Sequence, residues 1–237
     1  MASTELVYLV DSYVREFGAV VVASEGGYVA LDRTCFYPGG GGQPYDTGVI
    51  LFGGKSLPVS EVFRRGRLVW HFVGESVPVG VEVVGRIDWG RRYAHMRYHT
   101  AQHMLSALFL GKLGARTTGN QIHADRAHMN FDLEKIDRES LLDIEEEANR
   151  WIKRDVEVKT YFLPRGEALR LLDPRRTKID RLPTDVEKLR IVEISGLDLC
   201  ACGGTHVKRT GELGRLRIVK VKSKGRAKKR VEFVLEW

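Results

Sequence analysis

The sequence predicts an α+β fold, with an antiparallel β domain first and a domain of helices and antiparallel strands second. Valine- and glycine-rich alternating runs fill the chain up to about Asp88, a helical pattern begins at Trp89, and alternating strands return at the C-terminus. At 237 residues, 43% of them hydrophobic, the chain is long enough for two modest domains. We place these domains at residues 1–90 and 91–237.

The N-terminal domain is expected to be a small antiparallel β-barrel. Its strands are predicted from short alternating runs, which are Gly18–Ala23, Tyr28–Leu31, Arg67–Phe72 and Val81–Val84. Glycine pairs at Gly26-Gly27 and Gly53-Gly54 separate these runs, as tight turns between strands require.

The C-terminal domain is expected to be a two-layer α/β sandwich. One helix runs from Trp89 to about Lys112, and Asp137 is a plausible N-cap for a second helix that ends near Ile152. The remaining expected elements are strands at Val156–Leu163 and Leu189–Ser195, a short helix at Glu167–Leu172, a polar loop at Asp173–Asp185, and a hairpin of Leu216–Val221 with Val231–Trp237.

Positive charge is concentrated near the C-terminus. From Lys208 to Arg230 the chain has eleven lysines or arginines and one acid, Glu212, so this segment carries +10 although the whole chain carries +7. A solvated hairpin would account for it, but clustered positive charge is also what a polyanion selects through counterion release. The candidate RNA-contacting residues of the hairpin are Lys220, Lys222, Lys224, Arg226, Lys228, Lys229 and Arg230.

A glycine-rich stretch lies at residues 36–44 and contains Gly39, Gly40, Gly41 and Gly42. Gln43 follows where a phosphate-binding loop would have Gly-Lys-Ser/Thr, so no nucleoside triphosphate site is expected. Four glycines in a row are costly to order, which indicates that the backbone must turn tightly or come close to another group. Three interpretations remain: a tight barrel turn, a surface whose peptide N–H groups contact a ribose or phosphate, or a segment that aims a nearby side chain into a pocket.

Two short segments supply the ligands of a candidate zinc site, with one ion per chain. His99 and His103 are four residues apart on the predicted helix and therefore share a face, and Cys202 and His206 flank a glycine pair. Thr100 occupies the position that a glutamate base holds in HExxH peptidases, which argues against peptidase activity. A purely structural site remains an alternative, because four protein ligands can close a tetrahedron.

Two polar residues near the second metal segment, Asp198 and Thr205, are candidate catalytic residues because a polar pocket beside the ion would need such groups. No apolar run approaches the roughly 20 residues that span a bilayer, and the N-terminus lacks the basic region of a secretory signal. Three cysteines without a disulfide pattern suit a reducing compartment. A cytoplasmic location without membrane attachment is therefore expected.

With these residues described, the chain resembles the AlaX family of freestanding alanyl-tRNA editing proteins. The matching segments are Leu31–Pro38 leading into the glycine stretch and Gln43, Asp46–Gly48, Met96–His103 and Cys202–Val207. The resemblance implies a β-barrel domain joined to a zinc-bearing editing domain, with the zinc held by His99, His103, Cys202 and His206. It also implies hydrolysis, in trans, of the ester that joins serine to tRNA(Ala), with Thr34 and Gln43 as pocket residues.

Three functional interpretations follow. The first is a zinc-dependent deacylase of mischarged Ser-tRNA(Ala), with Gly-tRNA(Ala) as a further candidate substrate and no use of ATP. The second is a tRNA-binding protein with a purely structural zinc. The third, a metal hydrolase of small esters or amides, is disfavoured by the +10 segment.

Overall fold

The computed structural model describes residues 2–177, 179–182, 184 and 186–236. The chain forms two compact units, Met1–His95 and Met96–Trp237, and the long helix α2 (Trp89–Leu113) contributes to both. Helices and largely antiparallel strands occur together, so the mixed α and β class expected from the sequence is confirmed. Among the described residues, no helix is both long enough and apolar enough to cross a membrane.

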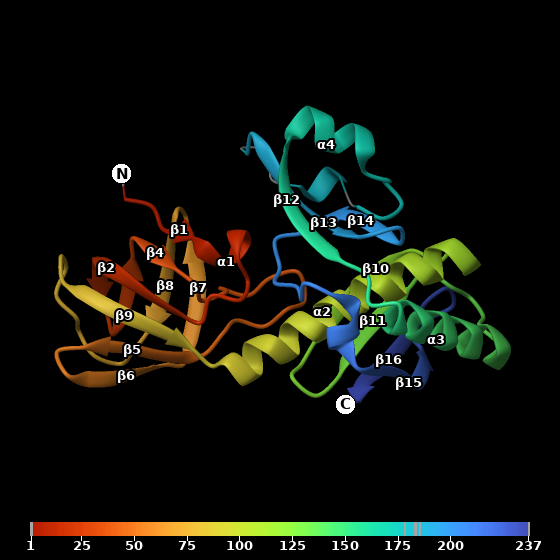
Figure 1. Cartoon of the computed structure of the whole chain (residues 1–237), viewed down its shortest axis with the longest axis horizontal. Coiled ribbons are helices and arrows are strands. Elements are labelled where there is room, and N and C mark those ends of the chain that lie inside the picture. Colours follow the sequence, from red (N-terminus) through yellow and green to blue (C-terminus); the bar gives the residue numbers. More distant parts are fainter. Residues whose placement is uncertain (1, 178, 183, 185, 237) are drawn as a thin grey trace. The chain divides into compact units, whose positions relative to one another are not determined.

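The first unit is built around a curled seven-stranded sheet in the order β6-β5-β9-β2-β3-β8-β7 (Figure 1). Its elements are β1 (Glu5–Leu6), α1 (Val7–Val10), β2 (Glu16–Glu25), β3 (Tyr28–Leu31), β4 (Arg33–Thr34), β5 (Gly48–Phe52), β6 (Lys55–Val59), β7 (Glu61–Arg65), β8 (Leu68–Phe72) and β9 (Glu82–Ile87). Each pairing in this sheet is antiparallel. β6 and β7 end the order, so the described strands form a curled sheet that is not closed by pairing.

The alternation seen in the sequence sets the core of this sheet. Phe17, Ala19 and Val21 of β2 point inward and are buried, as the two-residue period of a strand requires. Gly48 lets two strands approach closely, because a Cβ added there would lie 2.2 Å from the carbonyl oxygen of Arg86. A larger residue at this position would therefore force β5 and β9 apart.

The second unit holds a four-stranded sheet in the order β10-β11-β16-β15 and a three-stranded sheet in the order β12-β13-β14. Besides most of α2, its elements are β10 (Thr117–Ile122), β11 (Ala127–Phe131), α3 (Arg138–Lys153), β12 (Val158–Pro164), α4 (Arg165–Leu171), the 3₁₀ turn η1 (Ile179–Arg181), β13 (Lys188–Ile194), β14 (Asp198–Ala201), the 3₁₀ turn η2 (Thr210–Leu213), β15 (Arg215–Ser223) and β16 (Lys229–Glu236). All pairings in both sheets are antiparallel.

Aromatic contacts pack α2 onto the four-stranded sheet. Phe109 of α2 stacks on Phe131 of β11, with the ring centroids 4.0 Å apart, and Tyr98 packs beside Phe233 of β16 at 5.9 Å. The helix ends at Gly114, whose φ of 64° leaves the helical region. This packing fixes the face of α2 that carries His99 and His103.

Helix α3 lies along the edge strand β15. Its N-cap is Asp137, as the sequence predicts, because the Asp137 carboxylate accepts a hydrogen bond of 2.7 Å from the Ser140 N–H. Asn149 both donates to and accepts from the Leu216 backbone at 2.9 Å. These contacts occupy backbone groups that an edge strand otherwise exposes.

The three-stranded sheet is packed against α4 through Ala168, Leu172, Leu189 and Ile191, all of which are buried. This packing positions β14, the strand that leads into the second metal segment. Two limits of the sequence-predicted elements, Asp185 and Trp237, lie outside the described residues.

Candidate metal centre

Helix α2 brings His99 and His103 onto one buried face. The two rings lie one helical turn apart, with centroids separated by 5.2 Å, and both residues are less than 5% exposed. The four-residue spacing read from the sequence therefore produces a pair of imidazoles that face the same point.

The chain that follows β14 supplies Cys202 and His206. Arg190 of β13 braces this turn, because its Nη1 donates to the carbonyl oxygens of Cys202 and Gly204 at 2.8 and 3.0 Å. The Cys202 N–H in turn donates to the Arg190 carbonyl oxygen at 3.1 Å. Hydrogen bonds thus run in both directions between the turn and strand β13, and they orient the Cys202 thiol and the His206 imidazole.

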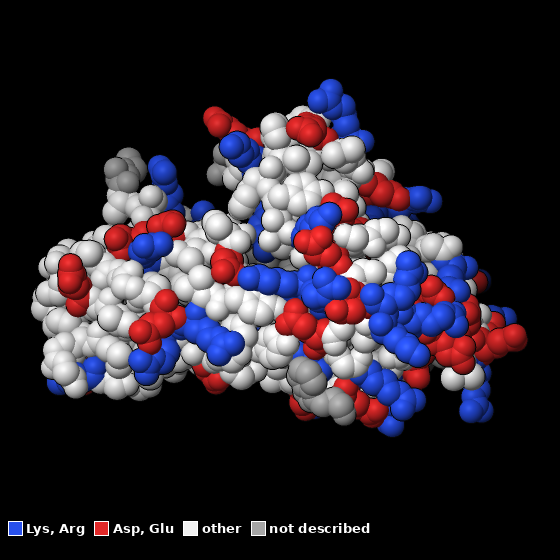
Figure 2. Space-filling model, in the orientation of Figure 1, with Lys and Arg blue, Asp and Glu red and all other residues white. Residues whose placement is uncertain are grey.

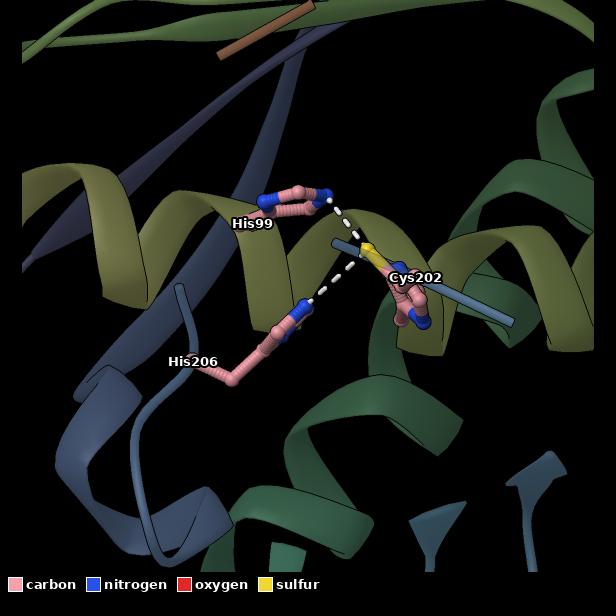
Figure 3. Close-up of side chains that lie close together, drawn as sticks. His99, Cys202 and His206 are labelled. Atoms are coloured by element: carbon pink, nitrogen blue, oxygen red, sulfur yellow. Dashed lines mark hydrogen bonds between the residues drawn. The ribbon is translucent and has the colours of Figure 1, made fainter. Parts of the chain in front are cut away.

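The four predicted ligands converge on one point. Each offers one donor atom, and these atoms lie within 4.8 Å of one another. Figure 3 shows His99 and His206 pointing at the Cys202 sulfur, which lies 3.6 Å from the His99 Nε2 atom and 3.4 Å from the His206 Nε2 atom. For tetrahedral zinc, the usual Zn–S and Zn–N bond lengths give an S···N edge of about 3.6 Å. The donor set and its spacing therefore fit one zinc ion.

The outer nitrogens of two of these rings are held by hydrogen bonds. The His103 Nδ1 atom lies 3.1 Å from Oδ2 of Asp198, and the His206 Nδ1 atom lies 3.1 Å from the Thr100 hydroxyl. The Val207 N–H also donates to that hydroxyl at 3.3 Å. Contacts of this kind fix the tautomer and direction of metal-binding histidines, so Nε2 of both rings is the nitrogen that would face a bound ion.

The electrostatics of the cluster favour a thiolate. Burial alone would raise the pKa of Cys202, yet His99 and His103 lower it well below its usual value. Burial alone would lower the pKa of His103, but the sulfurs of Cys200 and Cys202 and the Asp198 carboxylate raise it well above the usual value. A bound cation must displace the His103 proton, because only neutral imidazole and thiolate ligate metals.

The structure places the two candidate catalytic residues next to the metal ligands. Asp198 is buried, and its carboxylate contacts His103. Burial alone would raise the pKa of Asp198, but the hydrogen bond to His103 and the charge of Arg176 lower it. Thr205 is fully buried in the turn between Cys202 and His206.

The two pocket residues implied by the family resemblance lie in the first unit. Thr34 is fully buried on β4, where its Oγ1 lies 2.9 Å from Nε2 of His71 and accepts from the Phe36 N–H at 3.1 Å. Gln43 is 2% exposed and closes the glycine stretch, since its backbone exchanges hydrogen bonds of 2.9 and 3.0 Å with Gly40.

The glycine stretch is a tight turn. Gly41 and Gly42 occupy its centre with φ of 58° and 87°, values that only glycine adopts freely, and the flanking Gly39 and Gly40 also have positive φ. The arms of the turn are joined by the Asp46 N–H, which donates to the Tyr37 carbonyl oxygen at 3.0 Å. Of the three interpretations of the glycines, the structure realises the tight turn, while contact with a ribose or phosphate and the aiming of a side chain into a pocket stay predictions.

A buried ion pair anchors this turn. Arg92 of α2 and Asp46 are both fully buried, and Nε of Arg92 donates to the two carboxylate oxygens of Asp46 at 3.1 and 3.0 Å. Arg92 also donates to the Ser12 carbonyl oxygen at 3.0 Å. Sequence reasoning missed this pair, because an arginine in an amphipathic helix is usually solvent-exposed.

Five of the seven candidate RNA-contacting residues of the hairpin are exposed, whereas Lys229 and Arg230 are half-buried. Lys222 pairs with Glu232 at 3.0 Å, whereas no ion pair occurs, within the described residues, for three exposed side chains that we term the loop cations: Lys224, Arg226 and Lys228. On the face shown in Figure 2, basic side chains are denser over the second unit than over the first. The loop cations are therefore available to an anionic partner.

Comparison with known proteins links both units to aminoacyl-tRNA synthetases. Residues 189–232 match the family described as the threonyl and alanyl tRNA synthetase second additional domain, and residues 2–91 match class II (A) tRNA synthetases. An alanine–tRNA ligase from Pyrococcus abyssi is 38% identical over 93% of this chain, which corresponds to 24% of the ligase. The chain is thus of the class of proteins related to a part of alanine–tRNA ligase.

Freestanding relatives match over nearly their full length. Alanyl-tRNA editing protein AlaX-M from Saccharolobus solfataricus is 45% identical, covering 98% of this chain and 99% of that protein. The AlaX-M protein of Methanosarcina mazei is 38% identical, with 98% and 96% covered. The chain belongs to the AlaX family of alanyl-tRNA editing proteins, as the sequence segments predicted, and its relatives named here are AlaX-M proteins.

Proposed function

We propose that this protein is a trans-editing hydrolase that deacylates mischarged Ser-tRNA(Ala) at a zinc-containing site. The observation that carries the proposal is the buried cluster of His99, His103, Cys202 and His206, in a chain that matches AlaX-M proteins over nearly its whole length. The reaction adds water across the ester, releasing serine and the free 3′ end of the tRNA. Such an enzyme acts in the cytoplasm and consumes no ATP.

Zinc bound by all four donors would orient the substrate or the pocket, and the attacking water would come from elsewhere. With one coordination position open, the ion would instead hold the carbonyl or amino group of the substrate or activate a water molecule. The ester is intrinsically labile, so the remaining task of the chain is to position it against a water molecule. Asp198 and Thr100 contribute by holding the outer nitrogens of His103 and His206. Thr205 and Gln43 are proposed to shape the pocket.

Selection of serine over alanine is assigned to Thr34. His71 donates from Nδ1 to the Val29 carbonyl oxygen at 3.2 Å, so in the neutral ring Nε2 is an acceptor and receives a hydrogen bond from the Thr34 hydroxyl at 2.9 Å. The Phe36 N–H occupies one lone pair of that oxygen, and the other is left to accept a hydrogen bond from the serine hydroxyl. A bound alanine would leave the acceptor unpaired, and this can lower its reaction by roughly 10⁴-fold.

The tRNA is proposed to contact the glycine turn, Gly39 to Gly42, and the basic hairpin. The loop cations would neutralise phosphates, together with Lys220, Lys222, Lys229 and Arg230. The partner is thus mischarged tRNA(Ala), and neither a membrane nor a nucleoside triphosphate is required.

The proposal is tested by incubating the protein with Ser-tRNA(Ala), Gly-tRNA(Ala) and Ala-tRNA(Ala), with and without a chelator, and measuring the amino acid released. We expect serine to be released, alanine to be retained and the chelator to stop the reaction. Thr34→Val should narrow the difference between the deacylation rates of Ser-tRNA(Ala) and Ala-tRNA(Ala). An unchanged ratio of these rates would remove Thr34 from this role. Release of no amino acid from any of the three would contradict the proposal.

A second candidate is a tRNA-binding protein with a purely structural zinc. It is favoured by the four protein donors within 4.8 Å, which can complete a tetrahedron and leave no position for water. It predicts tight binding of tRNA(Ala) without turnover, so the deacylation assay separates the two functions.

A further inference from the structure

We propose that Arg176 is a positioning residue for the metal centre, acting through Asp198 to aim His103. This inference rests on the proposed metal site and concerns a residue that ligates nothing itself. Arg176 lies in the turn between α4 and η1, far in sequence from both metal segments.

Arg176 grips Asp198 with two donors. Its Nε lies 2.7 Å from Oδ1, and its Nη2 lies 2.6 Å from Oδ2. The side chains of Arg176 and Asp198 are only 12% and 2% exposed. A forked pair of this kind fixes the plane of the carboxylate, because rotation of either partner would break one of two charge-assisted hydrogen bonds.

The carboxylate fixed in this way holds His103. Oδ2 of Asp198 is shared between Arg176 and Nδ1 of His103, which lies 3.1 Å away. The Cys200 sulfur competes for the same nitrogen at 3.2 Å. Since His103 has two neighbouring acceptors for one N–H, the direction of its ring depends on which acceptor is held in place. Because the bidentate contact from Arg176 holds the Asp198 carboxylate in place, His103 Nδ1–H bonds to Asp198, and His103 Nε2 is thereby directed toward the other three ligands.

The fold holds Arg176 in position to do this. The Arg176 and Thr177 N–H groups donate to the Asp173 carbonyl oxygen at 2.9 and 2.8 Å, which closes the turn. The preceding Leu172 is buried in the core beneath α4. The neighbouring Arg175 provides a contrast, because it is 69% exposed and contacts Asp173 instead of the metal centre.

The test measures metal binding itself. Chelator-treated full-length protein is titrated with Co²⁺, following the thiolate-to-cobalt and ligand-field absorption, and Zn²⁺ affinity is measured by competition with a chelating dye. We expect Arg176→Ala to weaken affinity by about 10- to 100-fold, as loss of such outer contacts does, and to alter the cobalt spectrum. Arg175→Ala, the matched control, should keep the affinity and spectrum of the wild type.

A double-mutant cycle separates positioning from general structural support. Arg176 Nη2 also lies 3.4 Å from the His103 carbonyl oxygen, a longer contact than those to Asp198. If Arg176 acts mainly through Asp198, Arg176→Ala should weaken the metal affinity much less in an Asp198→Ala background than in the wild type, so additive losses of affinity would overturn the proposal. If Arg176→Ala does not fold, the same test compares Arg176→Lys with Arg175→Lys. We expect only Arg176→Lys to weaken the metal affinity. Equal affinities of Arg176→Ala and the wild type refute the role of Arg176 alone, whereas a wild type that binds no metal refutes the metal centre as well.

Discussion

His71 should make the free energy of unfolding decrease in acid, by an amount that follows from the burial of its ring. The ring is fully buried between Thr34 and the Val29 carbonyl oxygen. Burial lowers the pKa of His71 from 6.5 to about 4. Above pH 6.5 neither the folded nor the unfolded chain holds this proton. Between pH 6.5 and about 4 only the unfolded chain binds it, so the free energy of unfolding falls as the pH falls.

The size of the effect comes from the shift in pKa. Each unit of pKa difference is about 1.4 kcal/mol, so the full shift corresponds to about 3 kcal/mol of stability lost by the lower end of that range. Other groups titrate in the same range, and a comparison with His71→Phe isolates this one. At neutral pH the variant should be less stable by about 1 to 3 kcal/mol, because Thr34 and Val29 lose their partner.

The assay is urea unfolding of both proteins at pH 7 and pH 4.5, followed by tryptophan fluorescence. On acidification we expect the stability of the wild type relative to His71→Phe to fall by between about 2 and 3 kcal/mol, so that the two proteins become similar in stability or the variant becomes the more stable. An NMR titration of the His71 ring measures the pKa directly. A stability difference that does not change with pH, or a ring that titrates near 6.5, would refute this explanation.

Three further predictions concern the buried ion pair, the metal centre and the hairpin. Asp46→Asn should destabilise the protein by about 3 to 5 kcal/mol in urea unfolding, because the Arg92 charge is left buried without its partner; a loss below about 1 kcal/mol would contradict this. Cys202→Ser should lose bound zinc in elemental analysis, while Cys35→Ala should retain it. Replacing the three loop cations with serine should reduce the slope of log K for tRNA against log salt concentration by about 2 to 3, and an unchanged slope would exclude them from phosphate contact.

The sequence was sufficient to predict the cluster of candidate metal ligands because its signal is local. A four-residue spacing on a helix fixes the relative direction of His99 and His103 whatever the rest of the fold does. Cys202 and His206 were recognisable because thiol and imidazole in one short segment form a donor set with few other uses. The convergence of these two residues with the histidine pair of the helix depends on the tertiary fold, so the spacing could only suggest it. In the structure, the donor atoms of all four residues lie within 4.8 Å of one another.

The supporting groups could not be predicted, because their role depends on contacts between distant segments. Arg176 and Arg92 read as ordinary surface arginines in the sequence, yet each is buried against a carboxylate from another element. Strand β10 was also missed, since Thr117–Ile122 is polar, contains Gly119 and shows no alternation. In each case tertiary packing overrides a weak local preference.

The contacts outside the metal ligands brace the site from both sides. Thr100, on the helix, holds the histidine of the turn, and Asp198, on β14, holds a histidine of the helix. Each segment therefore orients a ligand that belongs to the other, so a displacement of α2 relative to β14 would disturb both rings together. A centre built in this way keeps its ligand directions through hydrogen bonds among its own residues, which lowers the cost of ordering the ligands when an ion binds. Thr100, in the position where a peptidase would have its glutamate base, thus acts here as part of this brace.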